Sequence, residues 1–164
     1  MTDATLTPGR LWKRMTSEQR LHAALAFWRD EEATNDQVQA IMLISQQKKF
    51  RPKTVLGLAE DRKAQHLATL PNLPEALAAR ALVVYHLTEQ RAMMGAFLDA
   101  LGIAHEDGVI QEDKIVPDAS KLAPAAARLA QEYPAADVWL YLNTLASQDP
   151  DTWGGLSALP QAQG

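Results

Sequence analysis

The sequence contains no cysteine, and this absence removes several classes of chemistry. Disulfide bonds, zinc–thiolate sites, iron–sulfur clusters and thiol nucleophiles all require the missing side chain. The eight glycines form neither a P-loop nor a dinucleotide-binding loop. No serine stands in the context of a nucleophile elbow. The sequence therefore contains none of these catalytic motifs, and we expect no cofactor.

Long apolar runs are also missing. No uninterrupted apolar stretch reaches the ~18 residues of a membrane span, so we expect no membrane contact. The N-terminal part lacks the basic head and apolar run of a signal peptide. Apolar residues make up 47% of the 164 residues and charged residues 22%, which is typical of globular proteins. We therefore expect a cytoplasmic protein with a core large enough for one domain.

The apolar residues that are present concentrate in residues 75–102. In the first half of this segment, only Arg80 and His86 interrupt a run of Ala, Leu, Val and Tyr residues. A helix that is apolar on nearly every side lies in the middle of its domain. The segment is either one long helix or two helices that meet near Thr88, and the mean helix length of about 11–12 residues favours the break.

Apolar periodicity and capping signals predict further helices on both sides of this segment. Thr16 and Gln19 have the spacing of a capping box at the start of the first of them. The predicted ranges are about 16–32, 35–49 (with Val38, Ile41, Met42 and Ser45 inward), 54–69 (interrupted near Gly57 or Glu60), 118–133 and 135–147. The predicted fold class is thus all-α, an irregular single-domain bundle of six to eight helices.

The domain boundaries follow from the same reading. Residues 1–10 lack periodicity and are expected to form a flexible arm, and residues 11–149 the single helical domain. Residues 150–164 are expected to be a tail anchored by Trp153. At most one short β-hairpin is expected, near 104–117, where the turn signal Asp107-Gly108 is accompanied by the apolar pairs Val109-Ile110 and Ile115-Val116.

Two histidines are the candidates for metal or acid–base chemistry. His86 stands in the most apolar helix, where a hydrogen-bonded, neutral core residue is the expected role. An enzyme would need His86, His105 and nearby carboxylates to converge, and the close His-x-x-x-His pairing of many metal sites is absent. We predict no metal site. Arg80 and Arg91 are expected to form ion pairs with neighbouring acids, such as Asp30, Glu31 or Asp99.

The chain has a net charge of −4, but the charge is unevenly distributed. Residues 46–63 contain six bases and two acids, whereas residues 64–164 contain five bases and twelve acids. The basic segment includes four bases around one aromatic side chain, a composition found where proteins contact phosphates and stack on a base. Its candidate binding residues are Lys48, Lys49, Phe50, Arg51 and Lys53.

A second group of candidate binding residues is His105, Glu106 and Asp107, which combines an imidazole with two acids after a helix end. The group lacks the ligand spacing of a calcium loop, and a solvated turn is the expected explanation. Segments Lys48–Lys53 and His105–Asp113 carry opposite charge.

The predicted function is a non-enzymatic helical interaction or scaffolding module, acting through a protein partner or through self-association. Two alternatives stay open. One is a metal-dependent or acid–base enzyme that uses His86 and His105. The other is a protein that binds nucleic acid or another polyanion through Lys48–Lys53. The acidic remainder of the chain disfavours nucleic acid, and cations also suit the negative end of a helix.

Overall fold

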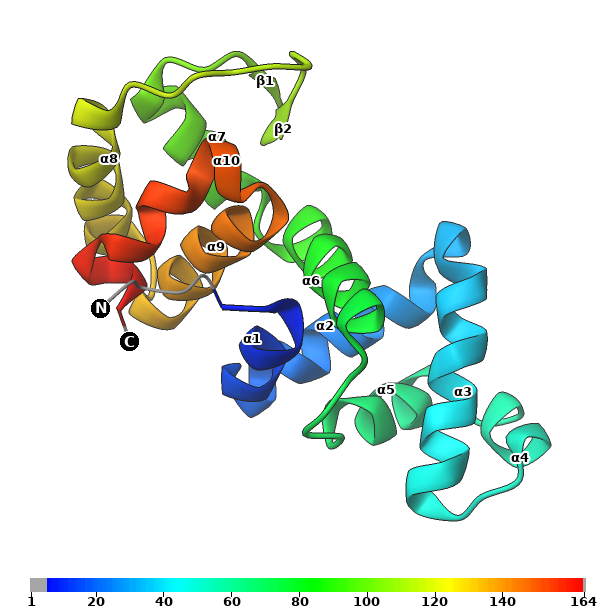
Figure 1. Cartoon of the computed structure of the whole chain (residues 1–164). Coiled ribbons are helices and arrows are strands. Elements are labelled where there is room, and N and C mark those ends of the chain that lie inside the picture. The colour runs from blue at the N-terminus through cyan, green and yellow to red at the C-terminus, as the bar shows by residue number, and fades with distance from the viewer. Residues whose placement is uncertain (1–5, 164) are drawn as a thin grey trace. The chain divides into compact units, whose positions relative to one another are not determined.

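The computed structural model describes residues 6–163 of the chain and contains ten α-helices in that range. Its only sheet there is a two-stranded antiparallel hairpin (Figure 1). With 75% of the described residues helical, the predicted all-α bundle with one short hairpin is confirmed. The number of helices exceeds the predicted six to eight because three short helices were not predicted. Pro8–Arg14 begins within the expected arm, Pro52–Leu56 forms separately where one longer helix was expected, and Pro150–Trp153 lies in the expected tail. No helix in residues 6–163 has the length and apolar character that a bilayer span requires.

The chain divides into two compact units. One comprises Pro8–Glu89, and the other comprises residues 90–163 with Leu6 and Thr7. The prediction of a single domain over 11–149 stays a prediction. Residues 1–5 of the expected arm lie outside the described residues, while residues 8–10 belong to a helix.

Six helices build the first unit. They are α1 (Pro8–Arg14), α2 (Ser17–Arg29), α3 (Thr34–Lys48), α4 (Pro52–Leu56), α5 (Glu60–Ala68) and α6 (Glu75–Glu89), with a short 3-10 helix at Glu31–Ala33. Helix α6 packs against α1, α2 and α3, and α2 also packs against α5. The capping box is confirmed, because Thr16 and Gln19 exchange two hydrogen bonds of 3.0 Å at the start of α2.

The inward face of α3 differs from the prediction. Ala40, Ile44 and Ser45 are buried, whereas Val38 and Met42 point to solvent. The helix packs through the stripe that contains Ala40, where the small side chain permits close approach to its neighbours. Helix α3 begins at Thr34, one residue before the predicted range. The predicted interruption after α4 is confirmed, with Gly57 as the C-cap of that helix.

An ion pair connects two parts of the first unit. The Arg80 guanidinium on α6 lies 3.2 Å from the Asp30 carboxylate and 3.9 Å from the Asp36 carboxylate. The pairing of Arg80 with Asp30 confirms the expectation that this arginine meets acids from neighbouring elements. All three side chains are partly exposed, so the pair positions α6 beside the start of α3 more than it stabilises the fold.

The second unit begins directly after a helix break. Its elements are α7 (Arg91–Leu101), β1 (His105–Glu106), β2 (Val109–Ile110), α8 (Ala119–Glu132), α9 (Ala135–Gln148), α10 (Pro150–Trp153) and 3-10 helices at Gly154–Ala158 and Pro160–Ala162. Segment 75–102 is therefore two helices, with Gln90 between them. Thr88, near which the two helices were expected to meet, lies in the last turn of α6. Gly102 ends α7 in the left-handed conformation, and the Ile103 amide donates to the Leu98 carbonyl.

Helix α9 is buried on most of its sides, including two polar residues. The Asn143 amide donates to the Ala162 carbonyl at 3.0 Å, and the Thr144 hydroxyl donates to the Leu140 carbonyl at 2.7 Å. These hydrogen bonds offset the desolvation of the polar groups. Trp153 is buried in the same core, where its ring centroid lies 6.0 Å from that of Phe97.

The hairpin has a different partner strand from the one expected. His105 lies opposite Ile110 and Glu106 opposite Val109, so Ile115-Val116 takes no part in it. The reason is the two-residue turn, in which Asp107 and Gly108 both have positive φ, at 53° and 89°. Such a turn joins only the residues that flank it directly.

Gly108 also holds the hairpin close to α7. A Cβ atom at this position would lie 2.9 Å from the Arg91 carbonyl oxygen and 2.9 Å from the Met94 Cβ. Both contacts are shorter than van der Waals distance. Glycine is therefore needed at this position for its conformation and for its small size.

We predict that Gly108→Ala lowers the free energy of unfolding by about 2–3 kcal/mol, since it combines backbone strain with a clash. Gly102→Ala is the matched control. Gly102 has a φ of 70°, but no atom would lie within 4 Å of its Cβ, so only the backbone term of about 1 kcal/mol applies. Urea unfolding of both variants measures the difference. Equal losses would contradict the close packing of the hairpin.

Candidate binding surfaces

A reversal of the chain after α3 presents the basic residues. Helix α3 ends at Lys48, and Lys49 takes the left-handed conformation with a φ of 58°. The Lys49 and Phe50 amides both donate to the Ser45 carbonyl, and the Ser45 hydroxyl donates to the Phe50 carbonyl. Pro52 then opens α4, which packs against α3. The Ser45 carbonyl at this helix end is thus satisfied by backbone amides.

Large apolar side chains are exposed on the same pair of helices. Val38 and Met42 are one turn apart on the solvent side of α3, with 56% and 49% of their surface exposed. Leu56 at the end of α4 is 61% exposed. We call this group of residues the basic surface: Lys48, Lys49, Phe50, Arg51 and Lys53 with Val38, Met42 and Leu56.

The four bases of the basic surface have no ion-pair partner among residues 6–163. The ion pairs of this unit therefore do not neutralise the basic segment. A surface with four unneutralised cations and several apolar side chains attracts anionic groups and gains free energy when its apolar part is covered.

His66 on α5 reports the positive potential of this region. Its ring contacts Phe50 edge to face, with centroids 5.4 Å apart. Burial lowers the pKa of His66 below its ordinary value of 6.5, and the charges of Lys48 and Arg62 lower it further. Lys48 of α3 and Arg62 of α5 thus both contribute positive potential at His66, next to Phe50.

The second group of candidate residues lies on the hairpin and the segment that follows it. The Asp99 carboxylate on α7 lies 2.7 Å from Nε2 of His105, and the Gly108 amide donates to Nδ1 of the same ring at 3.0 Å. Because Nδ1 accepts a hydrogen bond, the proton of the neutral ring is on Nε2 and is donated to Asp99. His105 is therefore held as a structural link between α7 and the hairpin.

Residues 105–118, which we call the acidic loop, continue from this link. The loop contains five acids and one base, and residues 111–118 form no helix or strand. Arg91 pairs with Asp107 at 3.8 Å, but Glu106, Glu112 and Asp113 have no ion-pair partner in the described part of the chain. Val116 is 95% exposed.

The two histidines proposed for catalysis do not form one cluster within either unit. His86 is buried in α6 of the first unit, and its Nδ1 lies 2.8 Å from the Leu82 carbonyl, to which it donates. His105 belongs to the second unit. Residues 6–163 contain no group of three or more metal-binding side chains. The geometry within each unit assigns both histidines to the support of neighbouring structure.

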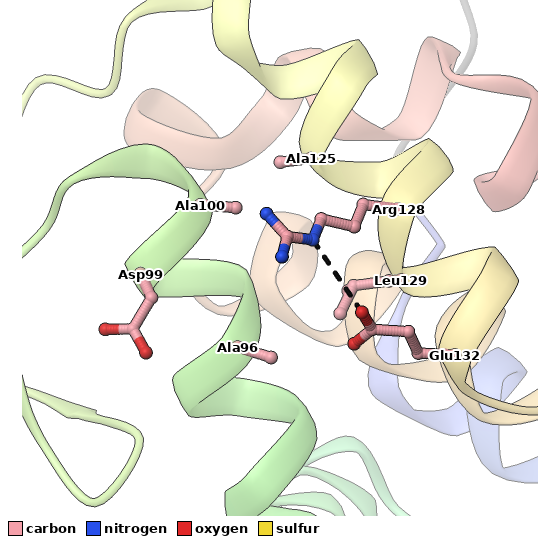
Figure 2. A pocket seen from close by; sticks show the side chains of 7 residues that line it. All are labelled: Ala96, Asp99, Ala100, Ala125, Arg128, Leu129 and Glu132. Carbon is pink, nitrogen blue, oxygen red and sulfur yellow. Dashed lines mark ion pairs between the residues drawn. The ribbon is translucent and has the colours of Figure 1, made fainter.

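A pocket of about 230 Å³ lies between α7 and α8, and the sequence analysis did not identify it. Its wall is formed by small apolar residues and Leu129, while Arg128 and Glu132 of α8 pair at 3.7 Å along one side (Figure 2). Asp99 lies on the α7 side and is already bonded to His105. Only the i, i+4 spacing of Arg128 and Glu132 is visible in the sequence, and it indicates an ordinary surface ion pair.

Comparisons with protein-family models, with curated proteins and with solved structures found no match to this chain.

We predict that Lys48→Gln raises the pKa of His66, since it removes a cation that opposes protonation of the ring. With a lowered pKa, the folded protein binds the proton less tightly than the unfolded chain, so stability falls as the pH drops below 6.5. The variant should reduce this loss. NMR titration of the His66 ring measures the pKa, and Lys121→Gln in the second unit is the control. An unchanged His66 titration would show that Lys48 does not act on this region.

Proposed function

We propose that this chain is a non-enzymatic protein-interaction module that binds an acidic partner segment on its basic surface. Such a partner would place carboxylates against Lys48–Lys53 and apolar side chains against Val38, Met42 and Leu56. The proposal keeps the cytoplasmic location expected from the sequence.

The observation that carries this proposal is the combination of exposed apolar side chains and unneutralised bases on α3 and α4. An apolar side chain contributes up to about 1.5–3 kcal/mol when it is transferred from water into an interface. Charges around such a patch contribute specificity and a faster encounter more than affinity. The side chains of the basic surface therefore have the properties of a recognition surface.

The positions of the titratable groups support binding over catalysis. His86 and His105 each hydrogen bond to structural neighbours, and the charged residues beside the α7–α8 pocket are already paired. A catalytic group must reach a reacting atom at hydrogen-bond distance. The histidines and the charged residues beside the pocket instead hydrogen bond or pair with other residues of the protein.

Binding of a nucleic acid or another polyanion is the second candidate. Its support is the convergence of Lys48 and Arg62 on His66, next to the exposed ring of Phe50. Phosphates would use these bases and Phe50 but would leave Val38, Met42 and Leu56 in water. The apolar side chains therefore distinguish the two candidates.

We predict that a fluorescent helical peptide with glutamates on one side and leucines on the other, the leucine peptide, binds the protein. Added salt should weaken this binding. A peptide of equal charge with serines in place of the leucines should bind at least tenfold more weakly, since it buries no apolar surface. Fluorescence anisotropy measures both affinities. A single-stranded oligonucleotide serves as the polyanion probe, and tighter binding of this probe than of the leucine peptide would favour the second candidate.

Variants of the protein locate the site of binding. Met42→Ser with Leu56→Ser should weaken the leucine peptide about tenfold or more, whereas Met42→Leu, which keeps the side chain apolar, should leave its affinity nearly unchanged. Melting temperatures of all three proteins should be similar, because the side chains are exposed. A peptide that binds the serine variant as tightly as the original protein would refute the proposed site.

A further inference from the structure

We propose that the acidic partner segment is the acidic loop of a second copy of this chain. In this contact, residues 105–118 of one copy lie on the basic surface of another. The inference rests on the proposed function and names the partner of the same surface.

The distribution of exposed apolar side chains is the first argument. Six large apolar side chains are exposed in residues 6–163: two lie in the acidic loop, two in residues 46–63, and two on the solvent side of α3. Val38, Met42, Phe50 and Leu56 belong to the basic surface, while Val109 and Val116 belong to the acidic loop. Val116 is almost completely in water although an apolar residue gains free energy from burial. Both segments therefore offer apolar area that a contact between copies would cover.

The charges of the two segments are the second argument. Residues 46–63 have six bases and two acids, which gives +4, and residues 105–118 have one base and five acids, which gives −4. The charges are equal in magnitude and opposite in sign. Because the relevant lysines and the acids Glu106, Glu112 and Asp113 lack ion-pair partners in the described chain, they are available to each other across a contact.

The acidic loop also distinguishes a second copy from other occupants. An anionic membrane or a nucleic acid would attract the basic surface but repel the acidic loop, and would leave Val116 in water. Binding between copies uses both segments. Each copy has one of each, so two copies can exchange contacts reciprocally or add further copies in a chain.

The strength of this association follows from its size. A loop of this length covers less than the ~800 Å² per partner of a standard interface, so we expect a dissociation constant in the micromolar range or above. Charge steering acts over a Debye length of about 8–10 Å at physiological salt, so the association should weaken strongly at 1 M NaCl.

A charge-swap experiment tests the inference. Analytical ultracentrifugation of the full chain from about 5 to 500 μM at low salt should show a mass above that of the monomer at the upper concentrations. Two double variants each remove the net charge of one segment: Lys48→Glu with Lys49→Glu, and Glu112→Lys with Asp113→Lys. Each variant alone should be monomeric, because one of its segments then has a net charge of zero and no longer attracts the other. An equimolar mixture should associate again, since the acidic loop of the first variant meets the basic surface of the second.

Three controls make the result decisive. Lys13→Glu with Lys121→Glu gives the same net charge as the first double variant, but at exposed sites outside both segments, and should associate like the original chain. Val116→Ser should weaken the association without lowering the melting temperature. A chain that is monomeric at every concentration, or a mixture that fails to associate, overturns the inference. If that chain still binds the leucine peptide on its basic surface, the proposed function stands and only the identity of the partner is wrong.

Discussion

Each compact unit depends on one helix whose side chains are buried on most sides, α6 in the first unit and α9 in the second. Such a helix must be surrounded, and the neighbouring elements need only one inward face each to surround it. In the first unit, α3 supplies Ala40 and Ile44 to the interior and needs nothing from its opposite side. The apolar residues on that opposite side therefore do not contribute to the fold, which leaves Val38 and Met42 available for recognition.

Local signals predicted much of the fold. The capping box at Thr16, the interruption near Gly57 and the turn at Asp107-Gly108 were predicted from residues close in sequence, and the structure has each of them. The predicted inward face of α3 was right for Ser45 but wrong for Val38 and Met42, and the error has a physical reason. Hydrophobic periodicity gives most weight to large residues, whereas the packed face uses alanine, which permits close contact with little apolar area of its own. Packing against neighbouring helices therefore buries the stripe of Ala40 and Ile44 and leaves the stripe of Val38 and Met42 in solvent.

The charge pattern was enough to select the candidate binding residues, but it did not predict their contacts or the exposed apolar residues near them. The sequence identified Lys48–Lys53 and His105–Asp107 by composition alone. It did not indicate that Asp99 would bond to His105, because their proximity depends on the hairpin folding back on α7. Nor did it indicate the exposure of Leu56 and Val116, which follows from where α4 ends and from the absence of regular structure around Val116.

The tight packing of the hairpin on α7 has an entropic consequence. Gly108 and the His105–Asp99 hydrogen bond fix the first part of the acidic loop, so binding there requires little further ordering. Residues 111–118 have no helix or strand to restrain them, and ordering one backbone residue costs about 1–2 kcal/mol. The acidic loop thus combines an ordered first part, the hairpin, with an irregular second part that can adapt to a partner. A contact that uses Val109 and Glu106 loses little conformational entropy, whereas the affinity gained at Val116 is reduced by the ordering of the residues that carry it.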